Sequence, residues 1–424
     1  MDSKTTLRWF IYLLVTFSSY IIGYFLLVQL GVLSEFPNNN NLLNWDSSWY
    51  HSIVNEGYYL DLENQCNAGF FPGFPYLWKL LGATPLMISI INGGLFISGL
   101  FILKEITQSD WKKYLIILSL PSTFFFFLPY SESLFYIFAI LFIFGWVKGE
   151  VWMIIIFAIL LSVVRPVFFF LIPALVVLNL FFQDKTVFKN SFLTIVSLLL
   201  GAFIGFVIIG LETGDLFAYS KSQVNQWGHE FKLTSLPLTT WRGYRILWLD
   251  ALALFTAFIA LFLLIKAFFF KKIKGKPHDL SQLEVIGLSY LVMILVYVLF
   301  FHPVEDGRTT ILSINRYVFC NPFLHYILFK RLISIKLEAS SLSLPVIVSV
   351  IILFIFGIPF YSIIGLDYNN SLVFGVAILI FALAQSLLIY KYKLLKYYFI
   401  PLVILNVLLQ LYLLNSYLKG NWIG

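Results

Sequence analysis

The chain alternates long apolar runs with short polar segments along its whole length. A helix that crosses a bilayer needs about 20 apolar residues, and this pattern predicts about 13 spans, some of them short. Pro129 and Pro166 fall between pairs of short runs, where a proline either kinks one helix or ends it. The pattern therefore predicts an all-α, polytopic transmembrane bundle, with residues 1–424 forming a single integral-membrane domain. The expected span cores are 9–30, 85–103, 113–129, 132–147, 150–164, 166–182, 191–211, 248–270, 283–301, 313–329, 343–364, 371–390 and 397–416.

Composition supports this class. Hydrophobic residues make up 60% of the chain and charged residues only 12%. An ordinary soluble domain carries about 25% charged residues, so that class is excluded. The net charge of +7 comes from short basic clusters between apolar runs, which is typical of a membrane protein rather than of a nucleic-acid-binding surface. Cys66 and Cys320 lie too far apart in sequence for a metal-binding spacing or a disulfide framework.

The distribution of Lys and Arg predicts how the chain crosses the membrane. Lys4 and Arg8 precede the first apolar run, which no small-residue cleavage site follows, so we expect a retained signal anchor. With the N-terminus in the cytoplasm, 19 of the 28 basic residues fall on the inner side, as the positive-inside rule requires. The long loops 31–84 and 212–247 then lie on the extracytoplasmic or lumenal side. An odd number of spans also places the C-terminus outside, after the spans within 331–424, whose role is less defined.

The first outer loop holds a carboxylate among aromatic residues. If residues 45–56 form a short surface helix, Asp46 and Tyr50 lie at i and i+4 on one face, and Trp45 and Trp49 repeat that spacing beside them. One interpretation is a carboxylate base in an aromatic-lined pocket at the membrane surface. The other is an interfacial helix anchored by its tryptophans, with Asp46 as the N-cap.

Three more charged residues sit at the ends of apolar runs. Glu132 is either a helix cap or a functional carboxylate. Arg165 needs a partner for its buried charge. Arg316 either extends its side chain to the membrane surface or binds an anion. The predicted topology brings these residues and Asp46 to one membrane face. Carboxylates and arginines together suit a reaction with an anionic leaving group, in which a base deprotonates a hydroxyl and a cation stabilises the departing phosphate.

The second outer loop carries a basic aromatic cluster. Trp241, Arg242, Tyr244 and Arg245 lie within five positions of one another. This cluster suits a lipid headgroup or a phosphate, and an interfacial aromatic belt explains it nearly as well.

Several of these segments resemble one known family. Trp45-Asp46-x-x-Trp49-Tyr50-x-x-Ile53-x-x-x-Gly57-Tyr58 resembles the first-loop signature of the PIG-V-type mannosyltransferases, which belong to the GT-C class of integral-membrane glycosyltransferases. Phe70-Phe71-Pro72-x-x-Pro75, Pro129-Tyr130-Ser131-Glu132-Ser133, Arg165-Pro166 and Arg316-Tyr317 are similar to further family elements, in the same order. The resemblance covers residues 7–330. Prokaryotic relatives share the motif without the glycosylphosphatidylinositol pathway, so the acceptor does not follow from it.

The resemblance implies a reaction and a set of binding residues. The donor would be a polyprenyl-phosphate sugar, with mannose as the expected sugar, and transfer would invert the anomeric centre. Asp46 would be the base, and Glu132 would orient the acceptor, the base or an arginine. The residues expected to bind the sugar, the phosphate or the prenyl chain are Trp45, Trp49, Tyr50, His51, Tyr130, Arg165, Trp241, Arg242, Arg316 and Tyr317. The acceptor would be a lipid-linked, glycan or protein hydroxyl, and no nucleic acid is expected.

The same residues bear on cofactor use and on two other functions. No carboxylate cluster has the spacing of a divalent-metal site, so no metal is expected, although Asp46 and Glu132 together could share an ion. A flippase or transporter of lipid-linked sugars should show charged or broken helices near the midplane and repeat symmetry, which the sequence lacks. A polyprenyl-dependent glycan polymerase or ligase would need a similar basic outer loop, so only the first-loop motif separates it from the transferase by sequence.

Overall fold

A computed structural model describes residues 3–235, 238–240, 246–272, 279–301, 303–305, 308–331 and 395–424. Within these residues, five helices are long and apolar enough to cross a membrane, and one sharply bent pair makes a sixth candidate. The all-α membrane class is therefore confirmed. The total of about 13 spans stays a prediction, and two of the expected spans, 343–364 and 371–390, lie outside the described residues. The five long helices are α1 (Ser3–Gln29), α4 (Pro85–Thr107), α9 (Lys185–Thr213), α11 (Leu247–Lys272) and α12 (Gln282–Phe300).

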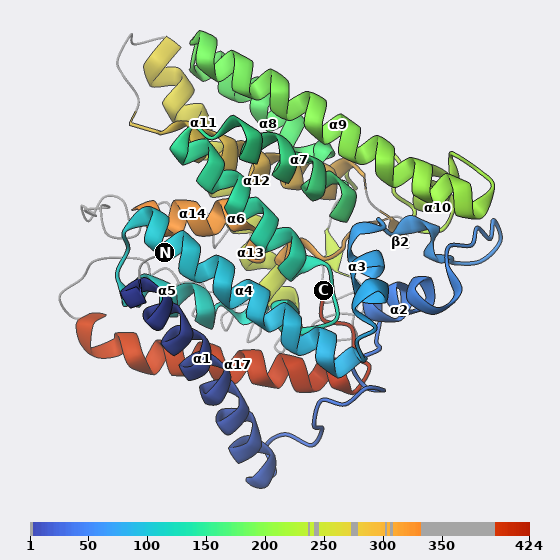
Figure 1. The fold of residues 1–424 in the computed structure, drawn as a ribbon, viewed down its shortest axis with the longest axis vertical. Helices are drawn as coiled ribbons and strands as arrows, with labels where there is room; N and C mark the ends of the chain where they lie inside the picture. Colours follow the sequence, from blue (N-terminus) through green and yellow to red (C-terminus); the bar gives the residue numbers. More distant parts are fainter. Residues whose placement is uncertain are drawn as a thin grey trace.

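Three shorter apolar helices fill the space between the long ones (Figure 1). They are α6 (Glu132–Lys148), α7 (Val151–Val164) and α8 (Phe168–Phe181). In the bundle, α4 packs on α6, α6 on α7, α7 on α9, and α8 on α12. The contact between α9 and α7 is especially close, because a Cβ added at Gly201 would clash with the carbonyl oxygen of Ile159. Small residues permit such close backbone approach between membrane helices.

A sharp bend precedes α6. The helical axis turns by 99° between η2 (Pro121–Phe127) and α6, since the proline at Pro129 cannot continue a helix. The carbonyl groups that this break leaves unpaired are satisfied from α4. The side-chain amide of Asn92 donates to the carbonyl oxygens of Leu128 and Tyr130 at 2.6 and 2.9 Å. Pro129 therefore separates two helices, η2 and α6, rather than kinking one continuous helix.

The described residues also contain a small sheet and one isolated antiparallel bridge, between Phe231 and Phe301. The strands of the sheet, β1 (Thr239–Thr240), β3 (Arg308–Ile311) and β2 (Val304–Glu305), pair in that order, β1 parallel and β2 antiparallel to β3. Threonine, valine and isoleucine favour extended backbone. The pairing joins the second outer loop to the segment before α13 (Ile314–Phe319).

The C-terminal part of the described chain packs against the segment that precedes α6. After α14 (Pro322–Arg331), the described helix α17 (Leu395–Leu418) packs against η2 and α5 (Trp111–Ser119). The side-chain amide of Gln410 donates to the carbonyl oxygens of Leu118 and Leu120, both at 2.7 Å. The buried Gln410 amide of α17 thus supplies hydrogen bonds to the carbonyl groups at the end of α5, which would otherwise be buried without a partner.

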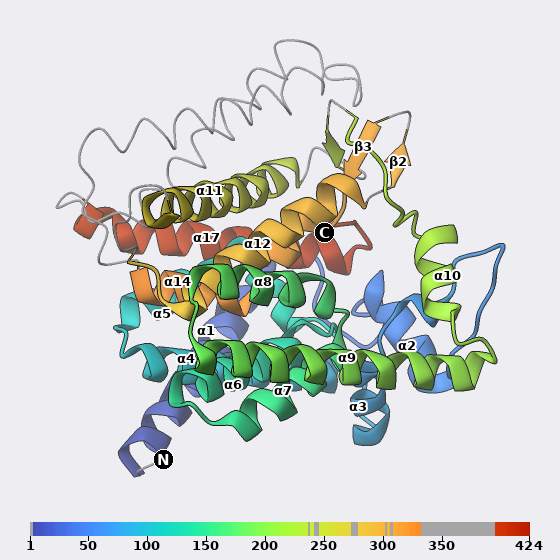
Figure 2. The same cartoon turned by 90° about the horizontal axis from the view of Figure 1, so that it is seen from above.

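The two predicted outer loops meet at one end of the bundle. In Figures 1 and 2, α2 (Asp46–Glu56), α3 (Gly73–Leu81) and α10 (Ala218–Asn225) gather on the same side, opposite the start of α1. The second loop docks on η1 (Asn67–Gly69) of the first. Residues far apart in sequence therefore share this end of the molecule.

Candidate active site

Asp46 opens α2 from an unusual backbone position. Trp45 has φ 57° and ψ −124°, a region that bulky residues rarely adopt and that is often found at functional sites. Trp45 occupies the N-cap position and no side chain caps the helix, so the interpretation of Asp46 as an N-cap is wrong. The buried hydroxyl of Ser47 donates to the Leu42 carbonyl at 2.6 Å and lies 2.9 Å from the Tyr417 hydroxyl. These contacts fix the start of α2 against α17.

Glu132 and Arg165 each lie at a helix end near a proline, Pro129 and Pro166 respectively. Glu132 begins α6 directly after the bend, and its side chain is 3% exposed. Arg165 follows α7 in extended backbone, with φ −149° and ψ 154°, as expected for a residue that precedes proline. Its Nη1 atom lies 2.7 Å from Glu132 Oε1. The Arg165-Pro166 pair thus ends one helix and places a guanidinium at the junction with the next.

Arg316 lies on the short helix α13. This helix begins after Ser313, which has left-handed backbone with φ 55° and ψ 17°. Its neighbour Asn315 donates its side-chain amide to Asp250 of α11 at 2.8 Å, and the same amide lies 3.3 Å from the Ile423 carbonyl oxygen. Asp250 is fully buried. Contacts from α11 and from the C-terminal segment therefore hold the turn that carries Arg316.

The four charged residues form one continuous ion-pair chain, which we call the charge cluster: Asp46, Arg316, Glu132 and Arg165. Arg316 Nη1 lies 2.7 Å from Asp46 Oδ2, and Arg316 Nε lies 3.1 Å from Glu132 Oε1. Glu132 thus contacts both guanidinium groups, and two positive charges balance two negative ones. This pairing offsets part of the cost of removing the four charges from water.

Aromatic rings surround both arginines. The Arg316 guanidinium lies 5.3 Å from the ring centre of Tyr130 and 5.6 Å from that of Tyr317. The Arg165 guanidinium lies 5.7 Å from the ring centres of Phe135 and Tyr317. Cation–π contacts of this kind stabilise a desolvated cation, and Tyr317 is shared by both arginines.

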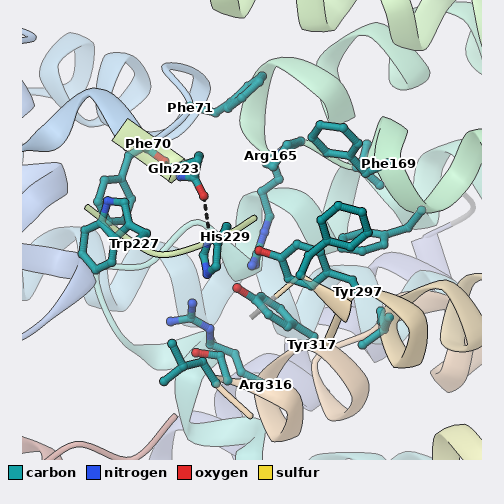
Figure 3. A pocket seen from close by; sticks show the side chains of 18 of the residues that line it. Phe70, Phe71, Arg165, Phe169, Gln223, Trp227, His229, Tyr297, Arg316 and Tyr317 are labelled. Atoms are coloured by element: carbon teal, nitrogen blue, oxygen red, sulfur yellow. Dashed lines mark hydrogen bonds between the residues drawn. The ribbon is translucent and has the colours of Figure 1, made fainter. Parts of the chain in front are cut away.

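The charge cluster borders a cavity of about 580 Å³ (Figure 3). Its polar wall includes Asp46, Arg165 and Arg316, whereas Glu132 lies behind it, outside the lining. Such a volume is within the usual range for sites that bind small organic ligands, about 300–1,000 Å³. Most of the remaining wall is aromatic or aliphatic, and comes from the first outer loop, α8, α10 and α12: Tyr50, Phe70, Phe71, Phe169, Phe170, Tyr219, Trp227, Tyr290, Ile294 and Tyr297.

Five of the predicted binding or catalytic residues line this cavity: Asp46, Tyr50, Arg165, Arg316 and Tyr317. The others lie around it or elsewhere. Trp45 packs on Trp422, which lines the cavity, with ring centres 5.0 Å apart. Trp49 packs on the lining residues Phe70 and Trp227, and Tyr130 packs on Arg316. His51 contacts Trp78 and Asn55 and is not part of the lining. Trp241 and Arg242 lie outside the described residues.

Burial shifts the pKa of two cavity residues, one in loop 31–84 and one in loop 212–247. It raises the pKa of the Tyr50 phenol above its usual range, with the nearby Asp46 charge as the next cause. Tyr50 is therefore a neutral donor, and its hydroxyl donates to Ser131 Oγ at 3.0 Å. Burial also lowers the pKa of His229 to about 4, so that imidazole is neutral at physiological pH.

Sequence reasoning missed several lining residues, above all Gln223, Trp227, His229, Tyr297 and Trp422. The first three lie in the predicted second outer loop, where Trp241 and Arg242 were the more conspicuous signal. A histidine beside a tryptophan in a long outer loop would have marked this part of the segment. Nothing in the local sequence links Trp422 to Asp46.

A metal site finds no support in the described residues. Among them, no group of three or more His, Cys, Asp or Glu side chains has the geometry to hold a metal ion. The expectation that Asp46 and Glu132 could share an ion does not fit their contacts, since Arg316 lies between the two carboxylates.

Comparison with known proteins adds no assignment. No protein-family model matches the chain, and neither a curated protein nor a solved structure matches it significantly. The site's own geometry therefore carries the functional argument.

Proposed function

We propose that this protein is an inverting glycosyltransferase that moves a sugar from a polyprenyl-phosphate donor to a hydroxyl acceptor. Mannose is the first candidate sugar. The observation that carries the proposal is one carboxylate and two guanidinium groups, from Asp46, Arg165 and Arg316, on the wall of a single aromatic cavity. Transfer from a phosphate-linked donor needs both a base and a cationic partner for the leaving group.

The proposed step is a single displacement. The acceptor hydroxyl oxygen attacks the anomeric carbon, and its proton passes to the Asp46 carboxylate. The bond between the anomeric carbon and the phosphate oxygen breaks in the same step, and its electron pair leaves with the lipid phosphate. Attack from the face opposite the leaving group inverts the anomeric configuration. Arg165 and Arg316 stabilise the charge that grows on the phosphate, as preorganised cations do in a site shielded from water.

The ion pairing in the charge cluster gives each member a role. Arg316 pairs with Asp46 at 2.7 Å, and a donor phosphate offers Arg316 a second anionic partner. The Asp46 carboxylate then shares its arginine partner with the phosphate and is free to contact the acceptor hydroxyl. Glu132, 3% exposed and behind the cavity wall, contacts both arginines. It is a positioning residue, which keeps the two guanidinium groups aimed at one phosphate.

The aromatic wall suits the rest of the donor. Phe169, Phe170 and Tyr290 line the cavity on the side of α8 and α12. Phe169 is 54% exposed, so this wall reaches the apolar outside of the bundle, where an isoprenoid chain would lie. We further propose the GT-C class, from the resemblance of residues 45–58 to the PIG-V signature, with the site on the extracytoplasmic or lumenal face.

The testing experiment is product identification. Membranes containing the protein, and membranes from the same cells without it, receive labelled polyprenyl-phosphate mannose, and in parallel arms the glucose and arabinose counterparts. The proposal expects label from one donor to appear covalently bound in a new product, identified by mass. Movement of intact donor across the bilayer without a new product would instead support a flippase, and would overturn the transferase.

A further inference from the structure

One cavity histidine is oriented by a hydrogen-bond chain that the proposed reaction does not use. His229 Nδ1 lies 2.6 Å from the side-chain oxygen of Gln223, the contact drawn in Figure 3. The His229 backbone N–H also donates to the Gln223 carbonyl at 2.9 Å. Both residues line the cavity, and the ring of Tyr297 packs on His229 with centres 5.6 Å apart.

The chain fixes which imidazole nitrogen carries the proton. The Gln223 side-chain N–H donates to the carbonyl oxygen of Gly69 at 2.9 Å. That contact turns the amide so that its oxygen faces His229, and an amide oxygen can only accept. His229 must therefore carry its proton on Nδ1 and leave Nε2 as an acceptor, since the partner of one ring nitrogen sets the state of the other.

In this tautomer His229 Nε2 can only accept, whereas hydroxyl groups on the same cavity wall, such as those of Tyr297 and Tyr317, can donate or accept. Arg165 and Arg316 are donors only, and Asp46 is engaged by Arg316. A sugar presents several hydroxyl groups, each of which needs an acceptor when it leaves water. Trp227 and Phe70 line the same cavity, with ring centres 5.8 Å apart, and offer the apolar faces against which a sugar ring packs.

We propose that His229 Nε2 accepts a hydrogen bond from a sugar hydroxyl, and that Gln223 is the positioning residue that keeps His229 in the Nδ1–H tautomer. The subsite takes an uncharged, polyhydroxylated group and belongs to the same cavity as the two arginines. The inference rests on the proposed function, because it deepens the substrate recognition of the same cavity.

The first test needs no enzymatic activity. The chain has five histidines, so ¹⁵N spectra of histidine-labelled protein in lipid nanodiscs are assignable by comparison with His229→Phe. We expect the Nδ1–H tautomer at pH 7 and a shift of the His229 Nε2 resonance on adding methyl mannoside, but not on adding inorganic phosphate. Gln223→Leu should mix the tautomers. An Nε2–H tautomer in the wild type, or no response to the mannoside, would overturn the inference.

The second test uses transfer. His229→Phe keeps the ring but removes the acceptor, and we expect KM for the sugar substrate to rise about tenfold with a much smaller change in kcat, as for one lost hydrogen bond. Gln223→Glu retains an acceptor for Nδ1–H, so its KM should stay close to the wild-type value. Gln223→Leu has no acceptor, so its KM should rise. Unchanged KM in His229→Phe would reject this subsite and leave the transferase standing. No transfer by the wild type in any donor arm would reject the transferase.

Discussion

Arg316 Nη1 lies 2.7 Å from Asp46 Oδ2, although the two residues are 270 positions apart in sequence. The pair joins loop 31–84 to the short helix α13, late in the chain. Both partners follow strained backbone, at Trp45 with φ 57° and at Ser313 with φ 55°. Strain of this kind persists only where the surrounding structure holds it, which supports a functional role for the pair.

Replacing either cavity arginine by lysine should weaken donor use more than acceptor use. Arg316→Lys and Arg165→Lys keep the positive charge, but an ammonium lacks the planar fork that contacts a carboxylate and a phosphate together. We expect KM for the polyprenyl-phosphate donor to rise about tenfold or more, measured by steady-state transfer at fixed acceptor. Equal effects on donor and acceptor would contradict a phosphate-binding role.

Neutralising Glu132 should cost both stability and donor binding. Glu132→Gln removes the carboxylate that contacts both arginines and leaves Asp46 paired with Arg316 alone. Breaking a buried pair costs about 3–5 kcal/mol. Because glutamine still accepts a hydrogen bond, we expect the lower part of that range, read from thermal unfolding in detergent. The matched control is Glu105→Gln, whose side chain is 38% exposed and pairs with Lys104. It should change stability by less than about 1 kcal/mol, and equal losses in the two variants would reject the cluster as a buried network.

Helix positions followed well from hydropathy. The expected cores 85–103, 132–147 and 191–211 fall within α4, α6 and α9. The reason is physical, since apolar runs in a membrane must pair their backbone groups internally and so become helices. The expected span 313–329 is instead split into α13 and α14, because Pro322 starts a second helix and ends the first. That split is what turns Arg316 toward the cavity.

The cavity wall was predictable only in part. Asp46, Glu132, Arg165 and Arg316 could be found because charge is rare in this chain and stands out beside apolar runs. Gln223 and His229 could not, since their place depends on how α10 docks on η1, which no local pattern encodes. His51 shows the opposite error, because its position inside a matching motif says nothing about which way its ring points.

The close contact between α7 and α9 should tolerate no side chain. Gly201→Ala adds a Cβ that would clash with the Ile159 carbonyl and forces the helices apart, so we expect a loss of about 1–3 kcal/mol. Gly94 of α4 has open space where its Cβ would lie, and Gly94→Ala should be neutral or stabilising by up to about 1 kcal/mol. Thermal unfolding of both variants in the same detergent checks this pair. A Gly201→Ala protein as stable as Gly94→Ala would show that the helices are not in close contact.

Stability should fall with acid in a way that depends on His229. Its pKa is about 4 in the folded protein, against 6.5 for an unperturbed histidine. Folding thus favours the neutral form of His229. Its contribution to the free energy of unfolding, up to about 3 kcal/mol, is fully present above pH 6.5 and is lost as the pH falls toward 4. The charged groups that share its cavity are Asp46, Arg165 and Arg316. His229→Phe should therefore lose less stability than the wild type between pH 6.5 and 4, and identical pH profiles of thermal unfolding would contradict the buried, neutral state.

The most direct test of the central claim is transfer by Asp46→Asn in lipid-reconstituted protein. Asparagine keeps the size of the side chain and can accept the hydrogen bond from Arg316, so folding and donor binding should persist. The control is Asp61→Asn, in the same loop but in an exposed turn. There the Asp61 carboxylate accepts hydrogen bonds from the backbone N–H groups of Glu63 and Asn64. With a labelled polyprenyl-phosphate sugar, we predict that Asp46→Asn loses at least about 100-fold in turnover while Asp61→Asn transfers at the wild-type rate. Wild-type turnover by Asp46→Asn would contradict its role as the base and, with it, the proposed mechanism.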